Sequence, residues 1–195
     1  MQQIRTFVAV ELDRAIKSAL RQVQTQLKGS QVSHIGRWVS PDSIHLTLKF
    51  LGDVPVSQVE EVKQALARAS QCCGPFSISL SGSGCFPNAR RPRVLWVGVG
   101  GDLERLTRLQ NAVDQELSCL GFKSEERSFE PHLTLARIRD NAGPQEREEM
   151  GRLITGAPVD TAASMVVRQI SLIRSDLQPS GPVYTCLAEV PLSVE

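Results

Sequence analysis

The sequence lacks the features that direct a chain into or across a membrane. Its longest apolar runs, such as residues 94–99, are far too short to span a bilayer. The opening residues, Met1-Gln2-Gln3-Ile4-Arg5, show neither the charged region, the long apolar stretch nor the cleavage site of a signal peptide. We therefore expect a cytoplasmic protein that has no membrane partner.

The chain also has few cysteines and almost no net charge. The five cysteines stand at irregular spacing and form no Cys-x-x-Cys pair, which argues against a zinc knuckle and against a disulfide framework. The net charge is only +1, whereas a protein that coats nucleic acid relies on many uncompensated cations. A small anionic target, which needs only a few local cations, remains compatible with this composition.

Short apolar runs alternate with amphipathic segments, a rhythm typical of an α/β or α+β protein. The chain has 195 residues, of which 41% are hydrophobic, and we expect one domain over 1–195 that consists of two joined lobes. Helices are predicted at 13–27 with Asp13 as the cap, and at 57–73, 102–120 and 144–154. Strands are predicted at 4–10, 44–51, 76–80, 93–99, 132–138, 165–174 and 182–190, with breaks at Gly52-Asp53 and at the turn Pro179-Ser180-Gly181.

The strongest pattern is the tetrapeptide His-Leu-Thr-Leu, which begins at His45 and again at His132. The chain has three histidines, so two of the three belong to this repeat, and the repeat indicates two related lobes. In a strand, residues i and i+2 point to the same face, so each imidazole should lie beside the hydroxyl of Thr47 or Thr134. The leucines then anchor each strand in the core. If the lobes face each other, both pairs share one cleft.

Two imidazoles and two hydroxyls suit displacement at phosphorus. Imidazole titrates near pH 6.5, so one ring can accept a proton from water while the other donates one to the departing oxygen. Threonine hydroxyls can donate hydrogen bonds to the non-bridging phosphate oxygens. No metal, no other cofactor and no covalent intermediate is required by this set. The residues alone do not decide which histidine is the acid.

The chain resembles the 2H phosphoesterase superfamily with its HxTx motifs, and within it the RNA 2',3'-cyclic phosphodiesterases, historically called 2'-5' RNA ligases. The resemblance covers nearly the whole chain. It is carried by four segments: Arg5-Thr6-Phe7-Val8-Ala9-Val10, His45-Leu46-Thr47-Leu48-Lys49-Phe50-Leu51-Gly52, Arg93-Val94-Leu95-Trp96-Val97-Gly98, and Pro131-His132-Leu133-Thr134-Leu135-Ala136-Arg137.

The resemblance implies two pseudo-symmetric lobes, with antiparallel sheets around a central cleft and the helices outside. It also implies that a 2',3'-cyclic phosphate at an RNA end or on a nucleotide is opened to a 2'-phosphomonoester. By family analogy His45 donates the proton, His132 accepts one, and Thr47, Thr134 and Arg137 bind the phosphate. We expect a monomer, and ligation of 2'-5' linkages as the main role remains an alternative.

Arg137 presents a conflict between pattern and resemblance. Its planar guanidinium suits phosphate, but simple alternation places a residue five after His132 on the opposite face of the strand. If Arg137 is to reach the phosphate, either the strand bends or ends there, or the side chain reaches round its edge. Lys49, four after His45, falls on the cleft side by the same alternation. Phe7, Phe50 and Trp96 either stack on a base of the substrate or pack in the core, and the sequence does not decide between these two roles. His34 is expected to be a surface residue.

Three other classes of function fit the sequence less well. A metal hydrolase needs three or four ligands, and neither motif contains a carboxylate. A dinucleotide-binding enzyme is disfavoured because Leu103 occupies the third glycine position after Gly98 and Gly100. The third class is a noncatalytic module that binds RNA ends, and the two intact motifs and the small net charge argue against it.

Overall fold

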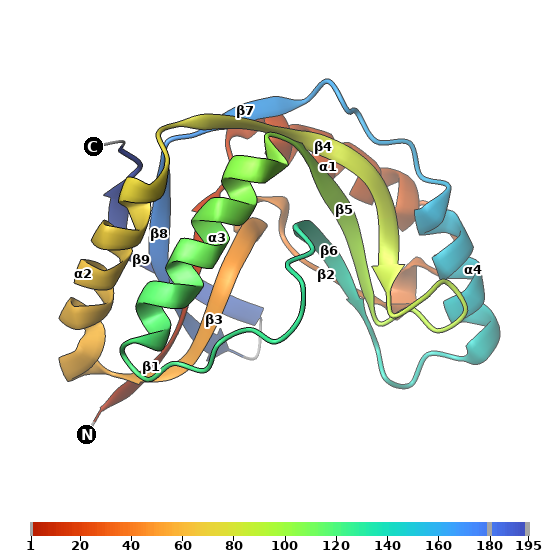
Figure 1. The fold of residues 1–195 in the computed structure, drawn as a ribbon. Coiled ribbons are helices and arrows are strands. Elements are labelled where there is room, and N and C mark those ends of the chain that lie inside the picture. Colours follow the sequence, from red (N-terminus) through yellow and green to blue (C-terminus); the bar gives the residue numbers. More distant parts are fainter. Residues whose placement is uncertain (1, 179–180, 194–195) are drawn as a thin grey trace.

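The computed structural model describes residues 2–178 and 181–193 (Figure 1). Its helices are α1 (Arg14–Lys28), α2 (Val59–Ala69), α3 (Leu103–Ser118) and α4 (Pro144–Thr155). Its strands are β1 (Gln3–Glu11), β2 (Gly36–Trp38), β3 (His45–Pro55), β4 (Phe76–Phe86), β5 (Val94–Gly101), β6 (His132–Ile138), β7 (Ser164–Val167), β8 (Gln169–Gln178) and β9 (Gly181–Pro191). No helix within these residues is both long and apolar enough to cross a membrane.

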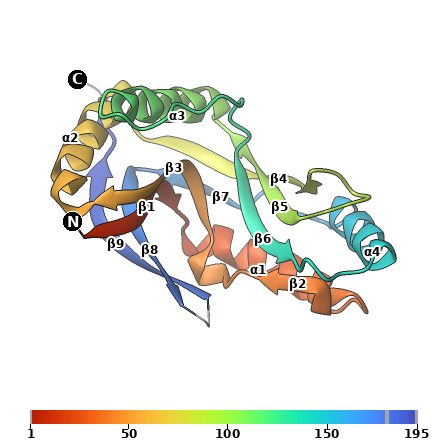
Figure 2. The ribbon, with the colours of Figure 1, turned by 90° about the horizontal axis from the view of Figure 1, so that it is seen from below.

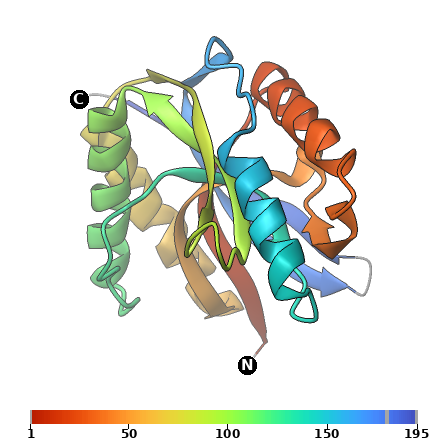
Figure 3. The ribbon, with the colours of Figure 1, turned by 90° about the vertical axis from the view of Figure 1, so that its right-hand side faces the viewer.

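The strands form two antiparallel sheets, with orders β3-β1-β8-β9 and β2-β6-β5-β4-β7. Helices α2 and α3 contact the first sheet through β9 and β3, whereas α4 contacts β4 and β5 of the second. Helix α1 also lies on the second sheet, where Gln24 donates hydrogen bonds to the carbonyls of Val39 and Leu135. The expected arrangement of two antiparallel sheets with outer helices is confirmed (Figure 3).

The two lobes are interlocked. Helix α1 follows a strand of the first sheet and packs on the second, while α3 follows a strand of the second sheet and packs on the first. One continuous hydrophobic cluster consequently contains residues from both sheets and all four helices. At the junction, β3 and β6 contact each other, so the two strands that carry the repeated motif are neighbours (Figure 2).

Helices α1, α3 and α4 begin within one residue of the predicted position, whereas α2 begins at Val59, two residues after Ser57, and ends at Ala69 instead of 73. The carboxylate of Asp13 accepts a hydrogen bond from the N–H of Ile16 at 2.9 Å, and Asp102 accepts one from Arg105 at 3.1 Å. Such caps satisfy N–H groups that have no partner inside the helix. The inward stripe of α1 is Ile16, Leu20, Val23 and Leu27, all buried.

Several predicted boundaries are wrong. Strand β3 does not end at Gly52 but continues to Pro55, because Gly52 has φ +72° and lies at an irregularity in the pairing with β1. Strand β4 runs six residues beyond Leu80, to Phe86. The predicted strand 165–174 is divided between β7 and β8, which belong to different sheets. Part of the predicted turn, at Pro179 and Ser180, lies outside the described residues.

The same irregularity occurs in both motif strands. Ala9 pairs with Thr47 and Val8 with Lys49, which leaves Leu48 without a partner; Trp96 pairs with Thr134 and Leu95 with Ala136, which leaves Leu135 without one. Each is a β-bulge, in which two residues of one strand oppose one of the next. In both cases the extra residue is the last leucine of His-Leu-Thr-Leu. Two successive side chains therefore point into the core, and the alternation is inverted beyond that point.

The first bulge turns Lys49 inward, so its predicted place on the cleft side is wrong. Lys49 is only 6% exposed, and its ammonium group pairs with Asp114 of α3 and donates to the carbonyl of Lys123 at 2.7 Å. Asp114 also accepts a hydrogen bond from the N–H of Glu125 at 3.2 Å. The pair thus ties β3 to α3 and to the segment that leads into β6.

We predict that Lys49→Met lowers the free energy of unfolding by about 3 kcal/mol, because it leaves the largely buried carboxylate of Asp114 without its cation. The double variant Lys49→Met/Asp114→Leu should recover most of this loss, since a buried ion pair can be replaced by apolar side chains of similar volume. Urea unfolding measures both quantities. A single variant as stable as the parent protein would contradict the structural role assigned to this pair.

Candidate active site

Each motif presents its histidine and threonine on one face of the strand. Leu46, Leu48, Leu133 and Leu135 are all at most 4% exposed, while the two histidines and two threonines are half-buried. The expected division between core leucines and polar side chains is therefore confirmed. His45 and His132 are the first residues of β3 and β6, respectively.

The two imidazoles are oriented in the same way. The Nδ1–H of His45 donates to the carbonyl of Ser43 at 3.0 Å, and the Nδ1–H of His132 donates to the carbonyl of Glu130 at 2.8 Å. A carbonyl oxygen only accepts, so the proton of each neutral ring resides on Nδ1. This leaves Nε2 of each ring as the atom that can take up or release a proton.

Aromatic side chains fix the first ring more tightly than the second. Phe7 stacks on His45 with ring centroids 4.5 Å apart, and Tyr184 meets the same ring edge-on at 5.2 Å. His132 has one edge-on contact, with Phe86 at 5.0 Å. Phe7 is only 3% exposed, so it supports the imidazole and has no free face on which a base could stack.

Burial lowers the pKa of His45 below 6.5, because the charged imidazolium is poorly solvated against Phe7 and Tyr184; the hydrogen bond to the Ser43 carbonyl opposes this shift. Burial also raises the pKa of Tyr184 above 10, and the positive charges of Arg137 and Arg5 oppose that change. Arg137 belongs to the second sheet and Tyr184 to the first. The charge of Arg137 thus acts on a side chain of the first sheet, and strands β3 and β6 contact each other where the two sheets meet.

The second bulge resolves the conflict over Arg137. Because Leu135 and Ala136 both point into the core, Arg137 emerges on the face of His132 and Thr134, where it is exposed. The first bulge likewise turns Phe50 to the face of His45 and Thr47. Phe50 is 66% exposed, and its ring centroid lies 5.9 Å from that of Phe7. Phe50 and Arg137 thus occupy equivalent positions in the two lobes.

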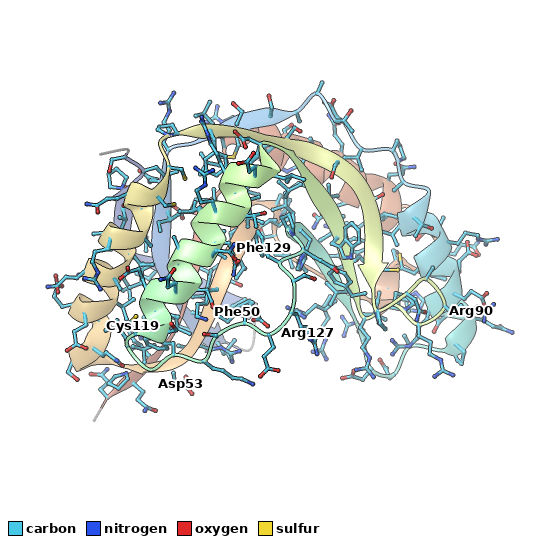
Figure 4. All side chains as sticks on the ribbon, viewed as in Figure 1. Phe50, Asp53, Arg90, Cys119, Arg127 and Phe129 are labelled. Carbon is cyan, nitrogen blue, oxygen red and sulfur yellow. The ribbon has the colours of Figure 1, made fainter. Side chains whose placement is uncertain are left out.

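Figure 4 labels Phe50 on β3, and Arg127 and Phe129 on the segment between α3 and β6. Beside His45 a pocket of about 400 Å³ lies between the end of β1, the start of α1 and strand β9. Its polar lining includes Glu11, Lys17, Asp42, Ser43 and Tyr184. A volume of this size is within the range of small-molecule sites.

The remaining sequence candidates lie elsewhere or are buried. Trp96 is half-buried and packs on Phe86 at 5.2 Å, with its indole nitrogen shielded from solvent. His34 is exposed and pairs with Glu146 at 2.9 Å, as expected of a surface residue. All five cysteines are free. Among the described residues, the one cluster of three groups that could hold a metal ion is Glu11, Cys186 and Glu189, and it includes neither motif histidine.

Sequence reasoning missed Tyr184 and Phe86, the aromatic contacts of the two imidazoles. Tyr184 is the single tyrosine of the chain, and it lies in the last strand, far from either motif in sequence. Phe86 was hidden because β4 was predicted to end at Leu80. Both contacts depend on which strands are neighbours in the sheets, which no local pattern records.

Each half of the chain matches the same family of known proteins. The LigT like Phosphoesterase family matches over residues 10–96 and again over 99–184, one match for each motif. An RNA 2',3'-cyclic phosphodiesterase of Methanothermobacter thermautotrophicus is 36% identical over 94% of this chain and 96% of its own length. One of Archaeoglobus fulgidus is 35% identical over 93% of this chain and 96% of its own length.

The fold is shared as well. The crystal structure of the Thermus thermophilus protein TT0787 aligns with a TM-score of 0.81 and 28% identity, over 98% of this chain and all of that one. The double match, the identity of the relatives along nearly their full length and the shared fold agree with the resemblance seen in the motifs. The chain belongs to the LigT-like phosphoesterase family, within the 2H phosphoesterases.

Proposed function

We propose that the protein hydrolyses the 2',3'-cyclic phosphate of RNA ends or nucleotides to a 2'-phosphomonoester, by acid–base catalysis with two histidines and without a metal ion. The observation that carries the proposal is the matched orientation of His45 and His132, each with Nδ1–H on a backbone carbonyl and Nε2 free. Relatives that carry the name RNA 2',3'-cyclic phosphodiesterase support the choice of substrate. The proposal also takes residues 1–195 as one two-lobed domain, a cytoplasmic monomer that needs no cofactor.

In the proposed step, Nε2 of neutral His132 accepts a proton from water while the water oxygen forms a bond to phosphorus. The bond between phosphorus and the 3'-oxygen breaks, and that oxygen receives the proton of Nε2 from charged His45. The product is a 2'-phosphomonoester with a free 3'-hydroxyl group. Exchange of protons with solvent then restores both rings.

Thr47, Thr134 and Arg137 are proposed to bind the non-bridging oxygens. Hydroxyl and guanidinium groups donate hydrogen bonds to these oxygens, where negative charge is spread in the transition state. All three side chains project from the face of the strand that carries a catalytic histidine. The bulges make this arrangement possible for Arg137 in the second lobe.

The lowered pKa of His45 has a direct consequence for its proposed role. A proton donor must be charged before the reaction, whereas burial favours the neutral ring in the free protein. A bound cyclic phosphate carries one negative charge, and an adjacent anion raises the pKa of an imidazole. Substrate would therefore generate the active protonation state of His45.

We predict hydrolysis of adenosine 2',3'-cyclic phosphate in the presence of EDTA, with adenosine 2'-phosphate as the product. Phosphorus NMR distinguishes the 2'-ester from the 3'-ester and follows the rate. Activity that disappears with the chelator and returns with a divalent metal would falsify the metal-independent mechanism. Tight binding of the substrate without turnover would instead favour the noncatalytic RNA-end-binding module, and efficient joining to a 5'-hydroxyl end would favour ligation as the main role.

We predict that His45→Ala and His132→Ala each reduce kcat by at least about a hundredfold, as expected when a positioned acid or base is removed. His34→Ala is the matched control, because among the described residues this exposed imidazole pairs with Glu146 and with the backbone carbonyl of Gln31, outside both motifs. It should retain parental activity. Near-normal turnover by either motif variant would show that another group carries the proton.

The same variants can assign the roles. A substrate with sulfur in place of the 3'-oxygen has a leaving group that needs no proton donor. On this substrate His45→Ala should regain most of its activity, and His132→Ala should not. The opposite pattern would reverse the assignment.

We predict that Phe7→Leu raises the pKa of His45 toward 6.5, because loss of the stacked ring lets water reach the imidazolium. In the parent protein the folded state binds this proton less readily than the unfolded chain, so the free energy of unfolding falls as the pH is lowered from about 6.5 through the pKa of His45. In Phe7→Leu the free energy of unfolding should fall by less over the same pH range. NMR titration of the imidazole Cε1–H measures the pKa, and an unchanged or lower value would contradict the desolvation account.

A further inference from the structure

Two arginines lie directly opposite each other on neighbouring strands of the second sheet. Arg37 of β2 is the register partner of Arg137 of β6, and both are exposed. The next residue, Trp38, points the other way, because its ring lies against Gly36 and the hydrophobic core and its indole N–H donates to the carbonyl of Ser33. Arg37 therefore shares the face of Arg137, which is the face of His132 and Thr134.

This pairing places like charges together at a cost to stability, since equal charges opposite each other in a sheet repel. Within residues 2–178 and 181–193, neither guanidinium takes part in an ion pair. Arg68 and Arg108 are neutralised by glutamates at 2.7 and 3.1 Å, whereas exposed Arg90 and Arg127 also take part in no ion pair among the described residues. What distinguishes Arg37 and Arg137 is that they lie directly opposite each other. A repulsive pair beside the candidate active site is the arrangement expected of a binding site for anions.

The number of charges favours two phosphates over one. Under the proposed function, the single negative charge of a 2',3'-cyclic phosphate is already matched by Arg137 and the charged ring of His45. Arg37 lies one strand further, about 4.8 Å away across the sheet, and leaves one positive charge unmatched. The terminal nucleoside of an RNA chain carries a second phosphodiester on its 5'-oxygen, whereas a free nucleoside 2',3'-cyclic phosphate does not.

We infer that Arg37 binds the phosphodiester on the 5' side of the terminal nucleoside, beside the cyclic phosphate held by Arg137. This inference rests on the proposed function and narrows its substrate to RNA chains in preference to free cyclic nucleotides. Arg37 is a specificity residue and takes no part in proton transfer. Removing it should weaken binding of the chain equally in the ground state and the transition state, and so should raise KM with little change in kcat.

The test compares two substrates that differ at the 5'-oxygen alone: adenosine 2',3'-cyclic phosphate and the dinucleotide that ends in the same group. The parent protein should show kcat/KM about tenfold higher for the dinucleotide, as expected of one charge-assisted hydrogen bond. Arg37→Ala should lose this advantage and leave the mononucleotide rate within about twofold of the parent. Arg37→Lys should retain part of it, because it keeps the charge without the planar fork.

Arg108→Ala is the matched control, since it removes the same charge from the outer side of α3 and should change neither rate. Salt provides an independent readout: the slope of log kcat/KM against log salt for the dinucleotide should become shallower by about 0.7 in Arg37→Ala, the value for one phosphate contact on a single strand. The unfolding temperature of Arg37→Ala should be unchanged or higher, because repulsion with Arg137 is removed.

The outcomes separate the two levels of the proposal. If Arg37→Ala lowered kcat/KM by the same factor on both substrates, Arg37 would act on the reacting phosphate. That result would overturn the inference and leave the proposed function intact. If Arg37→Ala had the same kcat/KM as the parent protein on both substrates, Arg37 would be a solvated side chain, and the inference would again be overturned. A parent protein that hydrolyses neither substrate would contradict the proposed function, and the inference would fall with it.

Discussion

The proposed chemistry depends on a backbone irregularity, the β-bulge at the last leucine of each His-Leu-Thr-Leu. In a regular strand the residue five after the histidine points away from it. The unpaired Leu48 and Leu135 invert the alternation, so that Phe50 and Arg137 project on the histidine side. The same inversion buries Lys49, whose ion pair with Asp114 ties the first motif strand to the segment that leads into the second.

Backbone carbonyls complete the arrangement by fixing the proton of each imidazole on Nδ1. His45 and His132 are alike in this respect, and they differ in their surroundings. The first ring lies between Phe7 and Tyr184 and its pKa is lowered by burial, while the second has a single edge-on contact with Phe86. A symmetric pair of strands thus holds two unequal groups, which is what separate acid and base roles require. Under the proposed function, the negative charge of the substrate phosphate favours the protonated form of the more buried ring.

The sequence predicted most of what depends on local pattern. The cap at Asp13, the inward leucines of both motifs and the architecture of two antiparallel sheets follow from local pattern or from the motif resemblance, and they are confirmed. The bulges could not be predicted, because an unpaired residue is defined by its partner strand and not by its own neighbours. Strand β2 was missed since three residues carry too little periodicity, and the 165–174 run shows no break because the chain passes between sheets without reversing. The role of Arg37 emerges only once β2 and β6 are known to pair.

The central claim is that one phosphate contacts both imidazoles. The most direct measurement is an NMR titration of histidine-labelled protein with adenosine 2'-phosphate. Our account predicts that the Cε1–H resonances of His45 and His132 shift along a single saturation curve, while exposed His34 remains in place. Movement of only one of the two, or two curves with different midpoints, would contradict a shared site.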